Sequence, residues 1–168
     1  MNVREAVLSD AKGIAKVHID SWRTTYKGLV PDQFLDSLDY DAREERWQNI
    51  IPNGKVWVAE NNQGEVVGFA SGGPERSGDY PSYEGEIYAI YILKDYQGQG
   101  LGKMLVKPIV EHLKQQGIGT MLVLVLEGNP ATHFYESVGG KAIGTENLTI
   151  AGKSLNEIVY AWDQLPEL

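Results

Sequence analysis

The segment from Gln97 to Lys103 combines residue types that could bind a ligand. It carries glycines at positions 98, 100 and 102, and it lies between an apolar, strand-like run and a helix-like one. Because glycine has no Cβ, the backbone can turn tightly here and successive N–H groups can converge on one point. A helix starting near Gly100 would add unpaired first-turn donors and a partial positive charge. The segment therefore predicts a phosphate site, with a plain structural turn as the alternative.

Two common nucleotide-binding patterns do not fit this segment. The dinucleotide fingerprint fails because Lys103 occupies the position of its last glycine, and the P-loop pattern fails because Met104 follows that lysine. Lys103 either touches a phosphate or is simply solvated. The residues predicted to form the anion site are Gln97, Gly98, Gln99, Gly100, Leu101, Gly102 and Lys103.

Three polar side chains stand next to apolar runs. Glu86 opens the run that ends at Leu93, and a carboxylate on such a strand is costly unless it is solvated, salt-bridged or functional. Asn129 follows the apolar run 121–126, where its amide could bond a ligand or an ordered water, cap the next helix, or do both. Tyr135 lies six residues further on, in a short helical segment. It is either catalytic or a core aromatic like its neighbour Phe134.

The alternation of apolar runs predicts the elements that position these residues. A helix between the strand at Ile87 and the strand at Val123 predicts a right-handed parallel crossover, so the two strands should be neighbours. We expect one α/β domain over residues 1–168, with a mixed, mostly antiparallel sheet. The expected strands are 3–7, 55–60, 65–72, 84–93, 121–126, 141–150 and 154–162, and the expected helices begin near 11, 31, 101 and 131.

The first predicted helix carries an aromatic stripe. His18, Trp22 and Tyr26 are spaced i, i+4, i+8 and should share one face, which indicates core packing or a substrate wall. The following segment, 31–47, mixes six carboxylates with aromatic residues. It is either a solvated helical face or an acidic entrance for an amine. The candidate substrate-binding residues are Trp22, Tyr26 and Glu86.

Composition narrows the class of partner. The formal net charge of −8 opposes binding to nucleic acid or anionic membranes and favours a cationic partner. The chain has no cysteine, and its three histidines are too scattered to predict a metal site. No apolar run reaches the roughly 20 residues that span a bilayer, and the N-terminus has no leader pattern. We expect a soluble, cytoplasmic protein.

These features together resemble the GNAT superfamily of acyl-CoA-dependent N-acetyltransferases. The segment Gln97–Gly102 is similar to the family's Q/R-x-x-G-x-G/A cofactor loop. Asn129-Pro130-Ala131 followed by Phe134-Tyr135-Glu136 looks like its second motif. The order of elements extends the resemblance over nearly the whole chain, although the N-terminal half carries little sequence signature. One departure is Gly140, where the family often has an aromatic residue, and this leaves the local packing in question.

The resemblance implies acetyl-CoA as co-substrate and assigns roles to site residues. The glycine-rich segment would bind phosphate, while backbone N–H groups near Ile90 and Ile92, together with Asn129, would bind pantetheine. Tyr135 would contact the cofactor and protonate the departing sulfur. Glu86 would be the general base, acting directly or through water, and its burial in an apolar strand would raise its proton affinity.

The implied reaction is direct attack by an amine on the thioester while both substrates are bound. No cysteine is present to form an acetyl-enzyme. Because the chain is acidic, we expect a small cationic amine as acceptor, with a peptide N-terminus or a lysine side chain as the rival. A non-catalytic acyl-CoA sensor is the further alternative. The exposed sheet edges and C-terminal hairpin are compatible with a homodimer, and the oligomeric state stays open.

Overall fold

A computed structural model describes all 168 residues. Its centre is a seven-stranded sheet in the order β1-β2-β3-β4-β5-β7-β6, in which only β4 and β5 run parallel. This confirms the predicted mixed, mostly antiparallel sheet and the predicted parallel neighbours. The strands are β1 (Asn2–Glu5), β2 (Val56–Glu60), β3 (Val66–Pro74), β4 (Gly85–Ile92), β5 (Met121–Leu126), β6 (Lys141–Ile150) and β7 (Lys153–Trp162).

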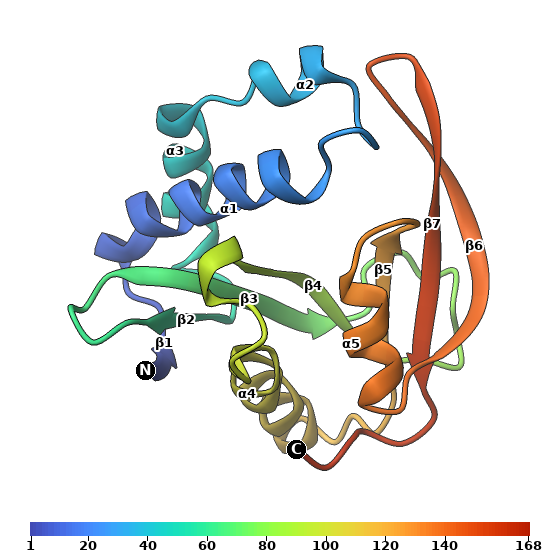
Figure 1. Cartoon of the computed structure of the whole chain (residues 1–168). Coiled ribbons are helices and arrows are strands. Elements are labelled where there is room, and N and C mark those ends of the chain that lie inside the picture. The colour runs from blue at the N-terminus through green and yellow to red at the C-terminus, as the bar shows by residue number, and fades with distance from the viewer.

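Helices cover both faces of this sheet. One face carries α1, α2 and α3, and the other carries α4 and α5 (Figure 1). None of the helices is long and apolar enough to cross a lipid bilayer. The helices are α1 (Ala11–Thr25), α2 (Asp32–Asp36), α3 (Tyr40–Ile50), α4 (Leu101–Gln115) and α5 (Ala131–Ser137).

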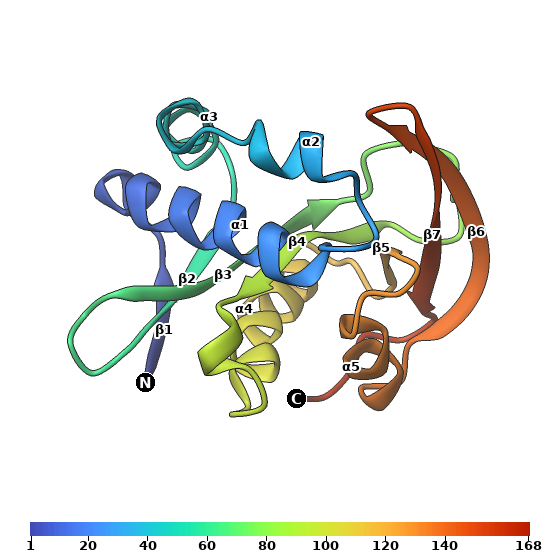
Figure 2. The same ribbon diagram turned by 45° about the horizontal axis from the view of Figure 1, so that its top comes forward.

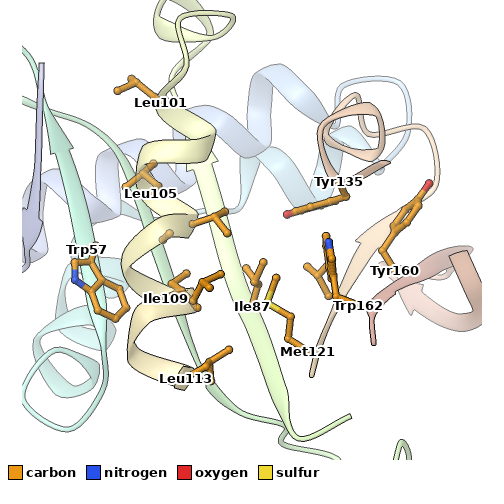
Figure 3. Close-up of a cluster of buried hydrophobic side chains, with 14 of the residues drawn as sticks. Trp57, Ile87, Leu101, Leu105, Ile109, Leu113, Met121, Tyr135, Tyr160 and Trp162 are labelled. Carbon is orange, nitrogen blue, oxygen red and sulfur yellow. The ribbon is translucent and has the colours of Figure 1, made fainter. Parts of the chain in front are cut away.

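The main hydrophobic core lies between α4 and the centre of the sheet. Leu105, Ile109 and Leu113 follow one another at helical spacing, and each is fully buried. They face Ile87 of β4 and Met121 of β5 (Figure 3). Burying a side chain of this size contributes about 1.5–3 kcal/mol. The crossover from β4 through α4 to β5 is therefore held by apolar contacts along its whole length.

The aromatic stripe of α1 packs on the opposite face of the sheet. The rings of Trp22 and Tyr26 lie 4.5 Å apart, and the ring of His18 stacks on Tyr91 of β4 at 5.2 Å. The indole N–H of Trp47 donates to Nδ1 of His18. Burial lowers the pKa of His18 to about 3, so this imidazole is neutral at physiological pH. The three predicted stripe residues do share a face, and His18 is a core residue.

The pairing of β4 with β5 ends early. Only Gly85–Ile87 pairs with Met121–Val123, and the two strands separate beyond that point. The separation coincides with a bulge in β4, because Ile87 pairs with Gly72 and Ala89 with Ser71, which leaves Tyr88 without a partner in β3. A bulge bends its strand and increases the local twist. The centre of the sheet is thus opened by one extra residue.

Candidate functional site

A cavity of about 480 Å³ occupies the space where β4 and β5 separate. Its walls come from α1, from the end of β4, from the segment leading into α4, and from residues 129–131 with Phe134. In two views these segments surround the open centre of the sheet (Figures 1 and 2). Residues far apart in the sequence therefore form one continuous binding surface.

One end of the cavity presents backbone donors. Gly98 and Gly100 have φ angles of +73° and +84°, in the left-handed region that favours glycine. Directly after Gly100 the 15-residue helix α4 begins, so its unpaired first-turn N–H groups face this end. Lys103 also lines the cavity. Backbone donors, a helix dipole and one ammonium group make this end suited to a phosphate or pyrophosphate.

The helix start is set against α5. A Cβ added to Gly102 would lie 2.9 Å from a ring carbon of Phe134, so these two elements touch with no space for a larger residue. Phe134 lines the cavity as well. The third glycine of the segment is therefore required for close packing between two helices, whereas Gly98 and Gly100 are required by their backbone angles.

The middle of the cavity presents the free edge of β4. Ile90 and Ile92 line it, and neither has a partner in β5, because the pairing stops at Ile87. Backbone groups that point across the opening are available to a ligand that carries amide groups, in the manner of an added strand. This is the environment predicted for pantetheine.

Asn129 connects the two sides of the cavity. Its Nδ2 donates to the hydroxyl of Tyr26 at 2.9 Å, and its Oδ1 accepts from the N–H of Ala131 at 2.9 Å. The amide thus orders the start of α5 and ties β5 to α1, while Asn129 also lines the cavity. Both sequence-based interpretations of this residue, a polar group at the site and a cap-like group for the helix, fit this position.

Tyr135 lies just outside the cavity wall and is 3% exposed. Figure 3 shows its hydroxyl directed away from Tyr160 and toward β4. Burial and the nearby Tyr91 raise the pKa of Tyr135, so the phenol keeps its proton at physiological pH. A protonated phenol beside the cavity is compatible with a proton donor. The packing of Tyr135 among core aromatic residues is equally compatible with the structural alternative.

Glu86 is bound by an arginine that the sequence analysis did not consider. Its carboxylate accepts hydrogen bonds from the backbone N–H and the side chain of Arg76, the shortest being 2.8 Å, and it is 4% exposed. The Arg76 guanidinium also lies 4.1 Å from the ring centre of Tyr88. Glu86 is therefore satisfied by an ion pair at the bulge, and it does not line the cavity.

The predicted site residues divide into two groups. Nine of them line the cavity, whereas Gln99, Glu86, Tyr135, Trp22 and Tyr26 do not. Gln99 instead donates to the carbonyl of Asp95. None of the carboxylates of the 31–47 segment reaches the cavity, which fits the solvated alternative for that segment. The lining residues are Ile90, Ile92, Gln97, Gly98, Gly100, Leu101, Gly102, Lys103 and Asn129.

Sequence reasoning missed several residues of the cavity wall. Ser21 and Thr25 of α1 line it one helical turn apart, and Tyr91 of β4 lines it beside them. Ser21 and Thr25 directly precede the stripe residues Trp22 and Tyr26 and have the same i, i+4 spacing. This spacing indicated that the two side chains share one face of α1. Nothing local in the sequence indicated that this part of α1 crosses β4.

Gly140 has a structural explanation. A Cβ at this position would lie 2.8 Å from the ring of Trp162, and the indole N–H of that tryptophan donates to the carbonyl of Val138. An aromatic residue from β7 therefore fills the space next to Gly140. The departure from the family pattern changes local packing and leaves the cavity intact.

Comparison with known proteins identifies the family that this chain resembles in sequence. The family model described as "Acetyltransferase (GNAT) family" matches residues 19–140. The chain is 44% identical over 168 residues to "Uncharacterized N-acetyltransferase YuaI" of Bacillus subtilis, covering 100% of this chain and 96% of the relative. It is 28% identical to an "L-methionine sulfoximine/L-methionine sulfone acetyltransferase" of Pseudomonas paraeruginosa, covering 78% of this chain and 74% of the relative.

A solved structure agrees in fold. The PaiA N-acetyltransferase of Thermoplasma acidophilum, in complex with coenzyme A, superposes with a TM-score of 0.75 at 19% identity. The match covers 95% of this chain and 96% of that one. The similarity therefore spans the sheet and the helices on both of its faces.

Proposed function

Because the chain belongs to the GNAT family and is an acetyl-CoA-dependent N-acetyltransferase, we propose that its acceptor is a small primary amine, cationic at neutral pH. The observation that carries the proposal is the cavity itself. It joins an anion-binding end, built from backbone donors at Gly98–Leu101, to the unpaired edge of β4 at Ile90–Ile92. A long ligand with phosphates at one end and amides along its length fits that sequence of groups.

The surroundings of the opening support a positively charged acceptor. The side chains of Glu86 and Glu157 lie close enough for Glu86 to raise the pKa of Glu157, and the chain carries a net charge of −8. An ammonium group gains electrostatic energy when it enters such a region. The Pseudomonas relative, named for two amino acid derivatives, supports a small acceptor. Peptide and protein amines are the competing class.

The reaction that we propose needs no covalent enzyme intermediate. The ammonium loses a proton to a carboxylate, and Glu86 is the predicted acceptor of that proton. It can act through water, or directly if Arg76 gives up one of its hydrogen bonds. The nitrogen lone pair then attacks the thioester carbonyl, so that the C–N bond forms and the C–S bond breaks. The amide nitrogen releases a second proton, and the thiolate receives one from Tyr135, which recovers it from solvent or nitrogen.

Thiol release from acetyl-CoA tests this proposal. The acceptor panel contains polyamines, amino acids, aminoglycosides and short peptides, and we expect turnover with a small amine. Tyr135→Phe should lower kcat about a hundredfold and leave the Kd for acetyl-CoA within a fewfold, because a positioned acid contributes about 10²–10⁴ in rate. Glu86→Gln is measured in parallel.

The matched control is Tyr160→Phe. Its ring centre lies 6.1 Å from that of Tyr135, but its hydroxyl donates to Glu136 and is directed away from the cavity. This variant should keep its activity. Turnover on peptides alone would replace the small-amine proposal, and acetyl-CoA binding without turnover on any acceptor would favour the sensor.

A further inference from the structure

Three carboxylates lie on the face of the sheet that carries α1 and α2. Glu157 of β7 pairs directly with Glu146 of β6 on one side and with Leu126 of β5 on the other, and directly opposed residues point to the same face. Leu126 packs with Tyr26, the residue that directly follows α1, and this contact identifies that face. Glu86 follows because its neighbour Ile87 faces α4, and adjacent strand residues alternate.

Only one of the three carboxylates has no partner. Glu86 is held by Arg76, and Glu146 accepts a hydrogen bond from the hydroxyl of Tyr80. Glu157 is half-buried, and its side chain makes no hydrogen bond and no ion pair in the structure. A partly buried, uncompensated carboxylate costs folding free energy. Such a position suits a cation supplied by a ligand.

Glu157 lies beside the cavity, although it is not one of the residues that line it. It is opposite the last residue of β5, at the point where the chain turns toward Asn129. It is also close enough to Tyr91, a cavity-lining residue, for its charge to raise the pKa of that phenol in addition to the effect of burial. The carboxylate therefore lies next to the part of the cavity wall that Tyr91 forms.

A second observation indicates that a polar ligand group is missing from this wall. The hydroxyl of Ser21 is fully buried and has no hydrogen-bond partner, and Ser21 lines the same cavity. Buried hydroxyl groups are nearly always hydrogen-bonded in folded proteins. The wall formed by α1 is thus incomplete until a polar group of a ligand reaches it.

We propose that Glu157, in place of Glu86, binds the ammonium group of the acceptor and accepts its first proton. This assignment rests on the acetyl transfer to a small amine proposed above and changes only the residue that takes the proton. The carboxylate takes one proton from the ammonium, and the neutral amine attacks the acetyl carbonyl. The second nitrogen proton balances the one that the thiolate receives, and Glu157 returns its proton to solvent. Glu86 then keeps its ion pair with Arg76 and takes no part in this proton transfer.

The charged groups around Glu157 favour its role as a proton acceptor. Burial raises the pKa of Glu157, and the carboxylates of Glu146 on β6 and Glu86 on β4 raise it further. The other titratable groups near it are Tyr91 on β4, Tyr80 beside Glu146, and Arg76 beside Glu86. A carboxylate with increased basicity is a better proton acceptor at neutral pH.

The test compares Glu157→Gln with Glu86→Gln, using spermidine and L-methionine sulfone as probes. For the probe that wild type acetylates faster, we expect Glu157→Gln to lower kcat/KM for the amine at least a hundredfold. It should also remove the acid limb of the pH–rate profile, with the Kd for acetyl-CoA unchanged. Glu86→Gln should retain the acid limb. Glu157→Asp should recover part of the activity, which separates a chemical role from a folding defect.

Glu146→Gln serves as the matched control. It removes one neighbouring negative charge from the same face, so the acid limb should move to lower pH while activity at pH 8 is retained. The proposal is overturned if Glu157→Gln keeps both its rate and its acid limb, or if Glu86→Gln alone loses that limb. It also fails if calorimetry shows that neither probe binds to the wild-type protein loaded with CoA and neither is acetylated. Turnover of other amines in the panel would then leave the proposed function standing.

Discussion

The two sides of the cavity are built from different parts of the protein. On the side proposed for the cofactor, the lining comes mostly from one short segment, Gln97–Lys103, which includes the first residues of α4 and whose backbone N–H groups are available to a ligand. On the side proposed for the acceptor, the lining side chains come from α1 and β4, and Glu157 of β7 lies beside them. A backbone-built site tolerates changes of side chain that keep the local conformation, whereas a site built from side chains depends on each of them.

This difference suggests how evolution can vary the acceptor while keeping the cofactor. The left-handed turns at Gly98 and Gly100 are proposed to bind phosphate groups, which all acyl-CoA molecules share. Glu157, Ser21 and Tyr91 lie on separate elements, so each can change independently. We therefore expect mutations on the cofactor side to affect every acceptor equally, and mutations on the acceptor side to change selectivity.

The largest effect on stability is expected where the two sides are joined. Asn129→Ala removes the donor to the hydroxyl of Tyr26, a residue that is 3% exposed, and the acceptor for the N–H of Ala131. Leaving buried polar groups unpaired costs about 1–3 kcal/mol, so the midpoint of thermal or urea unfolding should fall accordingly.

Tyr26→Phe and the double variant complete this experiment. If the two residues contribute through their mutual hydrogen bond, the double variant should lose less than the sum of the single losses. Additive losses would mean that the bond between the sides is not important for stability.

A somewhat smaller effect is expected on the cofactor side. Gly100→Ala keeps an open space around the new Cβ but forces an L-residue to φ of +84°, which costs roughly 1–2 kcal/mol. Because the turn can relax by changing the directions of its N–H groups, the affinity for CoA should fall about tenfold, as measured by calorimetry.

Gly78→Ala is the control for this variant. Gly78 has a similar φ of +75°, also has open space around it, and lies outside the cavity. It should lose similar stability and bind CoA normally. Equal CoA affinities in the two variants would contradict a backbone-built anion site.

The smallest effect concerns the acceptor side, where stability should depend on pH. The folded-state pKa of Glu157 is raised from 4.5, so its protonated form stabilises the fold below about pH 4.5, and this contribution is lost as pH rises through the folded-state pKa. Glu157→Gln should therefore match wild type in melting temperature near pH 4 and exceed it at pH 8.

Glu84→Gln removes an exposed carboxylate just before β4 and serves as the comparison. Its melting temperature should stay close to that of wild type at both pH values. If Glu157→Gln melts below wild type at pH 8, the carboxylate has a stabilising partner, and its interpretation as an unpaired group is wrong.

The sequence predicted more of the proposed cofactor side of the cavity than of the proposed acceptor side. Strand and helix positions were predicted to within a few residues for the segment 84–162, because apolar runs, glycines and Pro130 mark their ends. Nine predicted site residues line the cavity, and all of them belong to β4, the glycine-rich segment or the turn after β5. Those segments contain, or lie next to in the sequence, the motifs from which the site was predicted.

The acceptor side was predicted less completely. Trp22 and Tyr26 share the predicted face of α1, but that face packs into the core, and Ser21 and Thr25 line the cavity instead. The pairing of Glu86 with Arg76 could not be predicted, because the two residues are ten positions apart across an irregular loop and loop conformation leaves no periodic signal. The roles of Glu86 and Tyr135 remain predictions.

The amino-acid sequence by itself determined the glycine-rich turn, the helix that follows it, the order of strands and the family to which they belong. Those features depend on local backbone preferences and on hydrophobic periodicity, both of which are written in consecutive residues. Only the tertiary structure decided where the sheet opens, which carboxylate lacks a partner and which face of α1 meets the cavity. Those properties depend on register and on distances between residues such as Glu86, Glu146 and Glu157, which no single stretch of sequence contains.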